Sequence, residues 1–142
     1  MSCYTTLCVD SQSHVQLAAN SSHFIGNAVP DPQPTQSDAH FVVLCTCPDE
    51  QTAEQLAQHL LSRSLVACVN LIPGITSLYH WQGELCRDQE VQLVLKTRAA
   101  CLPELEACIK DNHPYEVPEI LALPVDWGHR PYLEWINQHC QP

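Results

Sequence analysis

The sequence contains few glycines and no long apolar run, and each shortage excludes a class of protein. Four glycines among 142 residues form no glycine-rich loop, so there is no phosphate-binding motif of the kinase or dinucleotide type. A G-x-S-x-G motif is also absent, which leaves an α/β-hydrolase without support. No stretch approaches the roughly 18 apolar residues that a membrane-spanning helix needs. We therefore expect no membrane segment.

Basic residues are also scarce. The chain has 6 Lys and Arg residues against 16 Asp and Glu residues, a net charge of −10. Proteins that bind nucleic acids or anionic membranes present a basic patch. We therefore expect neither as a partner, whereas the negative charge is compatible with cations and with basic partners.

The nine cysteines are an odd number, so they cannot all pair within one chain. The first 39 residues contain no Lys or Arg and therefore lack the charged region that begins a signal peptide. Together these features favour a reduced protein in the cytoplasm.

The composition changes at residue 40. Residues 1–39 are polar, show no helical or strand period and end in a proline-rich stretch at 30–34. Such a segment favours an extended spacer, so we interpret 1–39 as a flexible tail and 40–142 as the folded domain.

Hydrophobic periodicity within 40–142 predicts alternating strands and helices. Strands are expected at 40–47, 66–72, 91–96 and 120–125, with an extended segment at 75–81 after Pro73-Gly74 and a turn at 82–84. Helices are expected around 53–61 and 102–109, the second ending before His113-Pro114, and a short one around 132–136. This order predicts an α+β, ferredoxin-like βαββαβ sandwich with a short C-terminal helix.

The first strand is apolar on both sides. Phe41, Val43 and Cys45 share one side, and Val42 and Leu44 share the other. Both helices of a ferredoxin-like fold cover one face of the sheet, so we expect another subunit to cover the second face.

Two segments offer candidate metal ligands. Cys45 and Cys47 lie two residues apart on a strand, so both sulfurs point to one side, and thiolates suit Cu(I) or zinc. Buried free cysteines also serve as packing residues, which is the competing interpretation. The second segment, 113–119 (HPYEVPE), presents His113, a tyrosine and two carboxylates on a loop stiffened by prolines. This segment is equally consistent with a metal-binding loop and with an ordered connecting loop that binds no metal.

Aromatic residues provide a weaker signal. Tyr79, Trp81 and Trp135 are candidates for lining a cleft between subunits, although aromatics at such positions are more often core residues.

Several motifs resemble one family, the CutA divalent-cation tolerance proteins. They are residues 44–50 (LCTCPDE), 67–81 (ACVNLIPGITSLYHW), 96–98 (KTR), 113–119 (HPYEVPE) and 132–136 (YLEWI). The resemblance covers about residues 40 to 139, in the family's order and spacing.

This resemblance implies a homotrimer of ferredoxin-like subunits, similar in shape to the PII signalling proteins, that binds copper or another divalent metal. It also implies a metal site. A cysteine matching Cys45 is a copper ligand in some bacterial members, and two adjacent histidines match Asn112 and His113. Because Asn112 replaces the first histidine, this chain would lack one ligand. The resemblance thus implies a copper site at Cys45, Asn112 and His113, with zinc and other divalent cations not excluded.

Three functions follow as hypotheses. The first is a metal-binding trimer for metal tolerance, and the second is a PII-like trimer that binds a small ligand or a partner. The third is an enzyme in which Cys45 or Cys47 acts with His113. An acidic chain disfavours a reactive thiolate, so we expect a non-enzyme.

Overall fold

The computed structural model describes residues 39–142, and the predicted tail at 1–39 lies outside this range except for Ala39. The elements follow the predicted order. The strands are β1 (His40–Cys47), β2 (Cys68–Trp81), β3 (Glu84–Arg98) and β4 (Leu121–Pro124). The helices are α1 (Glu50–Ser62), the short 3₁₀ helix η2 (Ala99–Cys101), α2 (Leu102–Asn112) and α3 (Arg130–His139).

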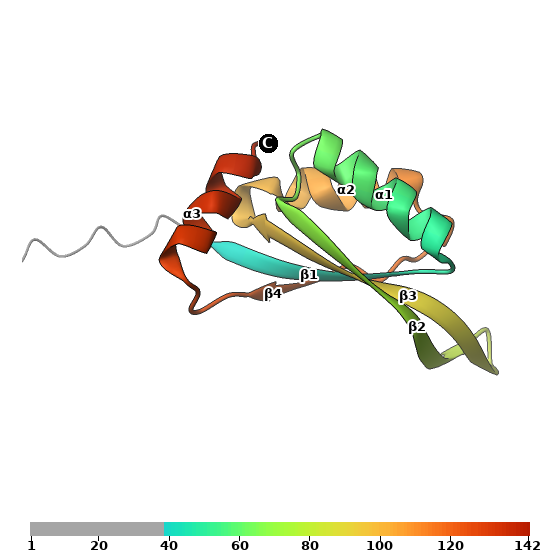
Figure 1. The fold of residues 1–142 in the computed structure, drawn as a ribbon. Coiled ribbons are helices and arrows are strands. Elements are labelled where there is room, and N and C mark those ends of the chain that lie inside the picture. Colours follow the sequence, from blue (N-terminus) through green and yellow to red (C-terminus); the bar gives the residue numbers. More distant parts are fainter. Residues whose placement is uncertain (1–38) are drawn as a thin grey trace, which may run out of the picture. The chain divides into compact units, whose positions relative to one another are not determined.

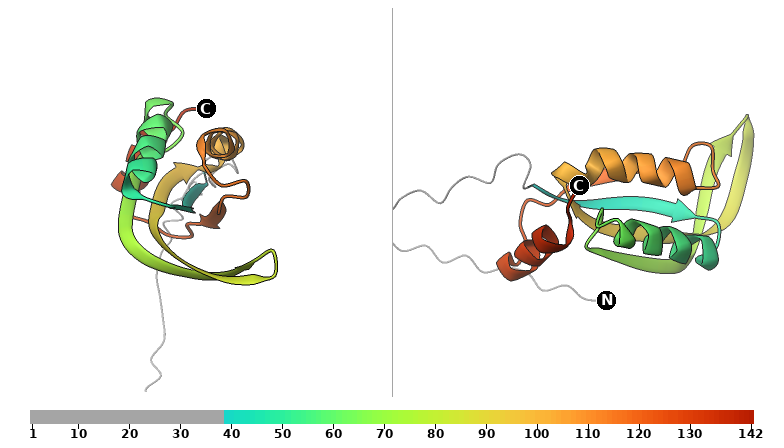
Figure 2. Two further views of the ribbon diagram at one scale, coloured as in Figure 1. Left: turned by 90° about the vertical axis from the view of Figure 1, so that its right-hand side faces the viewer. Right: turned by 90° about the horizontal axis from the view of Figure 1, so that it is seen from above.

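The four strands form one antiparallel sheet in the order β2-β3-β1-β4. Helices α1 and α2 lie side by side on one face, as Figures 1 and 2 show, and α3 lies near the end of β3. The fold is therefore the expected α+β, ferredoxin-like sandwich, and its second face carries neither α1 nor α2.

Helix α1 has a defined beginning. Asp49 precedes it in an extended conformation, and its side chain accepts a 2.7 Å hydrogen bond from the backbone N–H of Thr52. This N-cap satisfies one of the donors that the first turn leaves unpaired, and Glu50 follows where the helix dipole favours negative charge. Asp49 is thus the N-cap of α1.

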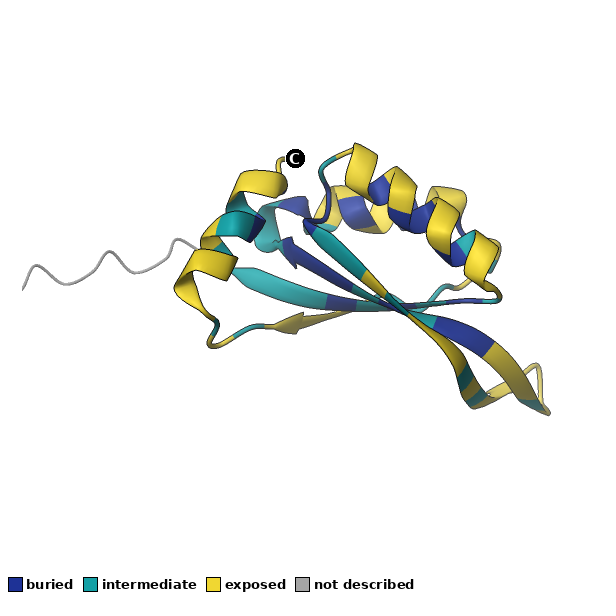
Figure 3. Cartoon of the chain, viewed as in Figure 1, coloured by how far each residue is buried: buried dark blue, intermediate teal, exposed yellow. Residues whose placement is uncertain are grey.

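Strands β2 and β3 are longer than the sequence pattern indicates. The interruption expected at Pro73-Gly74 is a bulge between Ile72 and Ile75 within one continuous strand, and Gly74 has a φ of +73° there. At the tip, Gln82 and Gly83 both have positive φ, as a two-residue hairpin turn requires. The resulting hairpin extends past the end of α1 (Figure 1), and its outer residues are largely exposed (Figure 3).

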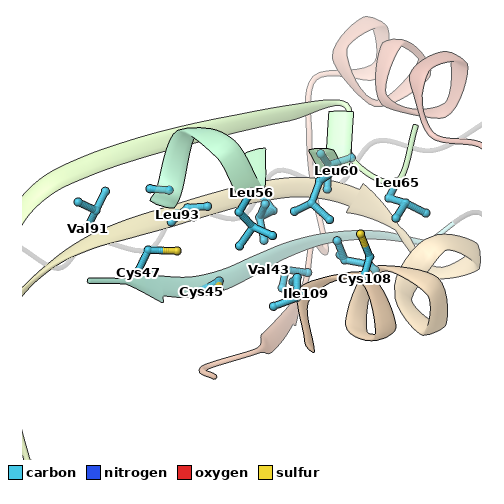
Figure 4. Close-up of a cluster of buried hydrophobic side chains, with 14 residues drawn as sticks. Val43, Cys45, Cys47, Leu56, Leu60, Leu65, Val91, Leu93, Cys108 and Ile109 are labelled. Carbon is cyan, nitrogen blue, oxygen red and sulfur yellow. The ribbon is translucent and has the colours of Figure 1, made fainter. Parts of the chain in front are cut away.

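The main core lies between the helices and the sheet. Val43, Cys45 and Cys47 of β1 face the helices and are fully buried. They pack with β3 and with the inner sides of α1 and α2, and Figure 4 shows both cysteines in this cluster. A second cluster joins α3 to η2 through Ile136, Cys140 and Cys101.

The helix-free face of the sheet is apolar as well. Val42 and Leu44 are paired with Leu123 and Leu121 of β4, so these four side chains share that face. Leu121 and Leu123 are 55% and 49% exposed. The structure thus confirms that apolar side chains line both sides of β1.

The cap of α1 gives a prediction. Asp49→Ala removes the acceptor for Thr52, so we expect a lower melting temperature at pH 7. The backbone hydrogen bond from Thr52 holds the pKa of Asp49 below its ordinary value of 3.8. Its stabilisation is complete above that value and is lost as the pH falls through the lower, folded-state pKa.

Circular dichroism melts should therefore show the gap between the native chain and Asp49→Ala shrinking from about pH 5 to about pH 2. Asp49→Asn, which keeps a neutral cap, is the control. A gap of constant size across this range would contradict the account.

Candidate metal centre

A cluster of two thiols and one imidazole lies where β1 ends. The Sγ atoms of Cys45 and Cys47 and a ring nitrogen of His113 lie within 4.8 Å of one another, and all three residues are buried. The strand pleat places both sulfurs on the helix-covered side, as the two-residue spacing predicts. His113 comes from the loop after α2, where the chain turns extended before Pro114.

His113 ties this loop to β1. Its Nδ1 accepts a 3.1 Å hydrogen bond from the backbone N–H of Tyr115, so the neutral ring carries its proton on Nε2. Nε2 lies 2.8 Å from the carbonyl oxygen of Thr46 and donates to it, and the Cys47 sulfur is 3.6 Å away. The imidazole therefore has no free lone pair in this arrangement.

The two thiols differ in acidity. A hydrogen bond with Cys47, together with burial, raises the pKa of Cys45 well above its ordinary value. The same hydrogen bond lowers the pKa of Cys47. The two thiols are therefore coupled, and a thiolate on one sulfur is stabilised by the S–H of the other.

Asn112, the other residue of the site that the resemblance implies, directs its amide toward α2 in this structure. Its side-chain Nδ2 donates a 2.8 Å hydrogen bond to the carbonyl oxygen of Cys108, one turn back on α2, and lies 3.8 Å from the Cys108 sulfur. Cys47 offers a third chemically suitable ligand atom beside those of Cys45 and His113. The site implied by the family resemblance does not include Cys47, although the C-x-C spacing already predicts that its sulfur lies on the same side as that of Cys45.

Two of the three aromatic residues expected at a cleft between subunits line a cavity within this chain. Tyr79 and Trp81 line a cavity of about 580 Å³, with Tyr115 and Glu90 among the other residues of its wall. Trp135 lies elsewhere, packed against the α3 cluster. Sequence reasoning did not single out Glu90, although strand alternation places it on the same side of β3 as Gln92.

A family model described as CutA1 divalent ion tolerance protein matches residues 41–139. The chain belongs to this family. The divalent-cation tolerance protein CutA of Escherichia coli O139:H28 is 50% identical over 103 residues, covering 72% of this chain and 92% of that protein. The family assignment confirms the resemblance that the sequence motifs indicate.

Solved structures of CutA1 family members share the fold. The Cut A1 protein of Thermus thermophilus matches with a TM-score of 0.71 and 46% identity, over 72% of this chain and 99% of that one. A CutA from Archaeoglobus fulgidus, described as a periplasmic divalent cation tolerance protein, matches with a TM-score of 0.69 and 34% identity, over 70% and 97%. Within residues 39–142 no helix is long and apolar enough to cross a membrane.

The hydrogen bonds of His113 give a second prediction. His113→Ala leaves the Thr46 carbonyl oxygen and the Tyr115 N–H without their partner, so we expect a loss of about 1–3 kcal/mol in the free energy of unfolding. Asn112→Ala, at an exposed neighbouring position, should change it by about 0.5 kcal/mol or less. Urea denaturation at one fixed chain concentration measures both. Equal losses in the two variants would contradict the role given to His113.

Proposed function

We propose that this CutA1 family member binds copper, or a similar soft metal such as zinc, and supports tolerance to metal ions. The cluster of Cys45, Cys47 and His113 carries the proposal. Two sulfurs and an imidazole suit Cu(I) and Zn(II), and carboxylates, which suit harder cations, are not part of the cluster. The names of the relatives, which refer to divalent cations, support the same role.

The two sulfurs are the first ligands in this proposal. Two metal–sulfur bonds of about 2.3 Å each span at most about 4.6 Å between the two sulfurs. The three ligand atoms of the cluster lie within 4.8 Å of one another, so little movement of the sulfurs is needed. His113 joins only after Nε2 releases its proton and the Thr46 carbonyl. Its Nδ1 must then carry the proton, which requires the Tyr115 N–H to move away. Binding at the thiols therefore precedes any movement of the loop.

We assign the cluster no catalytic step. Cys47 has a lowered pKa and a nearby histidine, which are features of a nucleophilic pair. Both cysteines are fully buried, however, and Nε2–H is already bonded to a backbone carbonyl. A substrate would have no access to the sulfur.

We further propose a cytoplasmic homotrimer. Exposed apolar side chains on the helix-free face support subunit contacts, and the seven cysteines of the described residues are free thiols, which fits a reducing compartment. The alternative is a PII-like trimer that binds a ligand or partner and takes up metal only incidentally. The cavity beside Tyr79 and Trp81 favours this alternative.

Metal titration tests the proposed ligands. Under anaerobic conditions, Cu(I) titration against a competing chelator, repeated with Zn(II), should give one tight site per chain. Cys45→Ser and Cys47→Ser should each weaken binding by more than the roughly 10- to 100-fold that loss of an outer-shell partner costs. Cys86→Ser, at a half-buried thiol on β3, and Asn112→Ala should leave the affinity unchanged. Full affinity in Cys47→Ser, with loss in Asn112→Ala, would exclude this ligand set.

Light scattering tests the trimer. The native chain should show three times the 15.9 kDa chain mass. Leu123→Lys places an unpaired ammonium on the apolar face, and burying such a charge is costly, so we expect a smaller assembly. Gln58→Lys adds the same charge to the exposed side of α1 and should leave the mass unchanged. A monomeric native chain, or an unaltered mass for Leu123→Lys, would exclude this interface.

A further inference from the structure

The cavity of about 580 Å³ lies on the opposite side of β1 from the two cysteines. Thr46, which lines it, points to the helix-free face because it alternates with Cys45 and Cys47 along the strand. The other walls come from the outer part of β2, from β3 and from the loop after His113. Its volume falls within the roughly 300–1,000 Å³ typical of small-molecule sites.

A buried carboxylate in the wall forms no ion pair within residues 39–142 of its own chain. Glu90 is only 6% exposed, and the ion pairs formed within residues 39–142 do not include it. The hydroxyl of Tyr115 donates a 2.9 Å hydrogen bond to its Oε1. Buried charges are normally paired, because burying an unpaired charge costs free energy. A bound cation would therefore stabilise a carboxylate that accepts only one hydroxyl hydrogen bond.

The remaining wall adds negative charge and no positive charge. Glu116 and Glu119 line the cavity with Glu90, and Lys, Arg and His are absent from the residues that form it. Glu119 accepts a 3.2 Å hydrogen bond from the Gln92 side chain, which fixes its carboxylate at the wall. A ligand with a positive charge therefore meets a complementary field here.

Aromatic side chains decide what kind of cation fits. Tyr79, Trp81 and Tyr115 line the same cavity, and the faces of such rings attract ammonium and guanidinium groups. A hydrated metal ion would fill only a small part of this volume and would leave the aromatic surface unused.

We propose that this cavity binds a small organic cation, an amine or amidinium group on an apolar body. The charged group meets Glu90, and the body lies against Trp81 and Tyr79. This proposal names the chemical class of ligand for the alternative function, a PII-like trimer that binds a small ligand. It does not depend on metal binding, because the metal centre lies on the other side of β1.

Isothermal titration of the full chain with 2-phenylethylamine, benzamidine and 1,5-diaminopentane tests the proposal. At least one of these probes should bind saturably, once per chain, whereas neutral 2-phenylethanol should bind at least about tenfold more weakly, a difference of about 1.4 kcal/mol. Glu90→Gln should weaken binding of the cation at least tenfold. Glu54→Gln makes the same change of charge on the exposed side of α1 and should have no effect.

Trp81→Ala is a second test variant. Because Trp81 is 46% exposed, we expect this substitution to perturb folding less than one at the buried Glu90. It should weaken binding several-fold while the melting curve stays that of a folded protein. Cys47→Ser, which removes a proposed metal ligand, should keep full affinity for the organic cation.

Three results would overturn the proposal. One is the absence of saturable binding by all three cations, and another is equal affinity for 2-phenylethanol. The third is displacement of the cation by MgCl₂ at matched ionic strength, with a dependence on Glu90, because that would indicate a hard metal site.

Discussion

The alternation of side chains along β1 is the constraint on which the other features depend. β1 lies between β3 and β4, so both its edges are paired and its register cannot slip without moving every side chain to the opposite face. This register places Cys45 and Cys47 in the core against the helices and Thr46 on the free face. The proposed metal centre and the proposed cation cavity therefore lie back to back on three consecutive residues.

His113 connects these two surfaces. Its ring donates to the Thr46 carbonyl beside the thiols, and the next residues, Pro114 and Tyr115, line the cavity on the other face. Recruiting the imidazole to a metal would break the bonds to Thr46 and Tyr115, and so would shift the loop that forms one cavity wall. In our proposals, a metal held by the two thiols alone leaves the cavity unchanged, whereas a metal that also recruits the imidazole moves one wall of the cavity.

Much of the fold could be predicted from the sequence because each element has a clear period. The apolar pattern gave the element order, and the two-residue spacing gave the shared direction of Cys45 and Cys47. The full length of β2 was not predictable, because Pro73 and Gly74 signal a break that a bulge absorbs. The orientation of the Asn112 side chain was not predictable either, because its hydrogen bond to the Cys108 carbonyl oxygen depends on where α2 ends.

X-ray absorption spectroscopy of the copper-loaded protein tests the central claim most directly, because it counts sulfur and nitrogen neighbours without relying on affinity. The account predicts two sulfur neighbours at a bond length typical of copper thiolates, and one of them should disappear in Cys47→Ser. A first shell of nitrogen and oxygen alone, or one unchanged by Cys47→Ser, would contradict it.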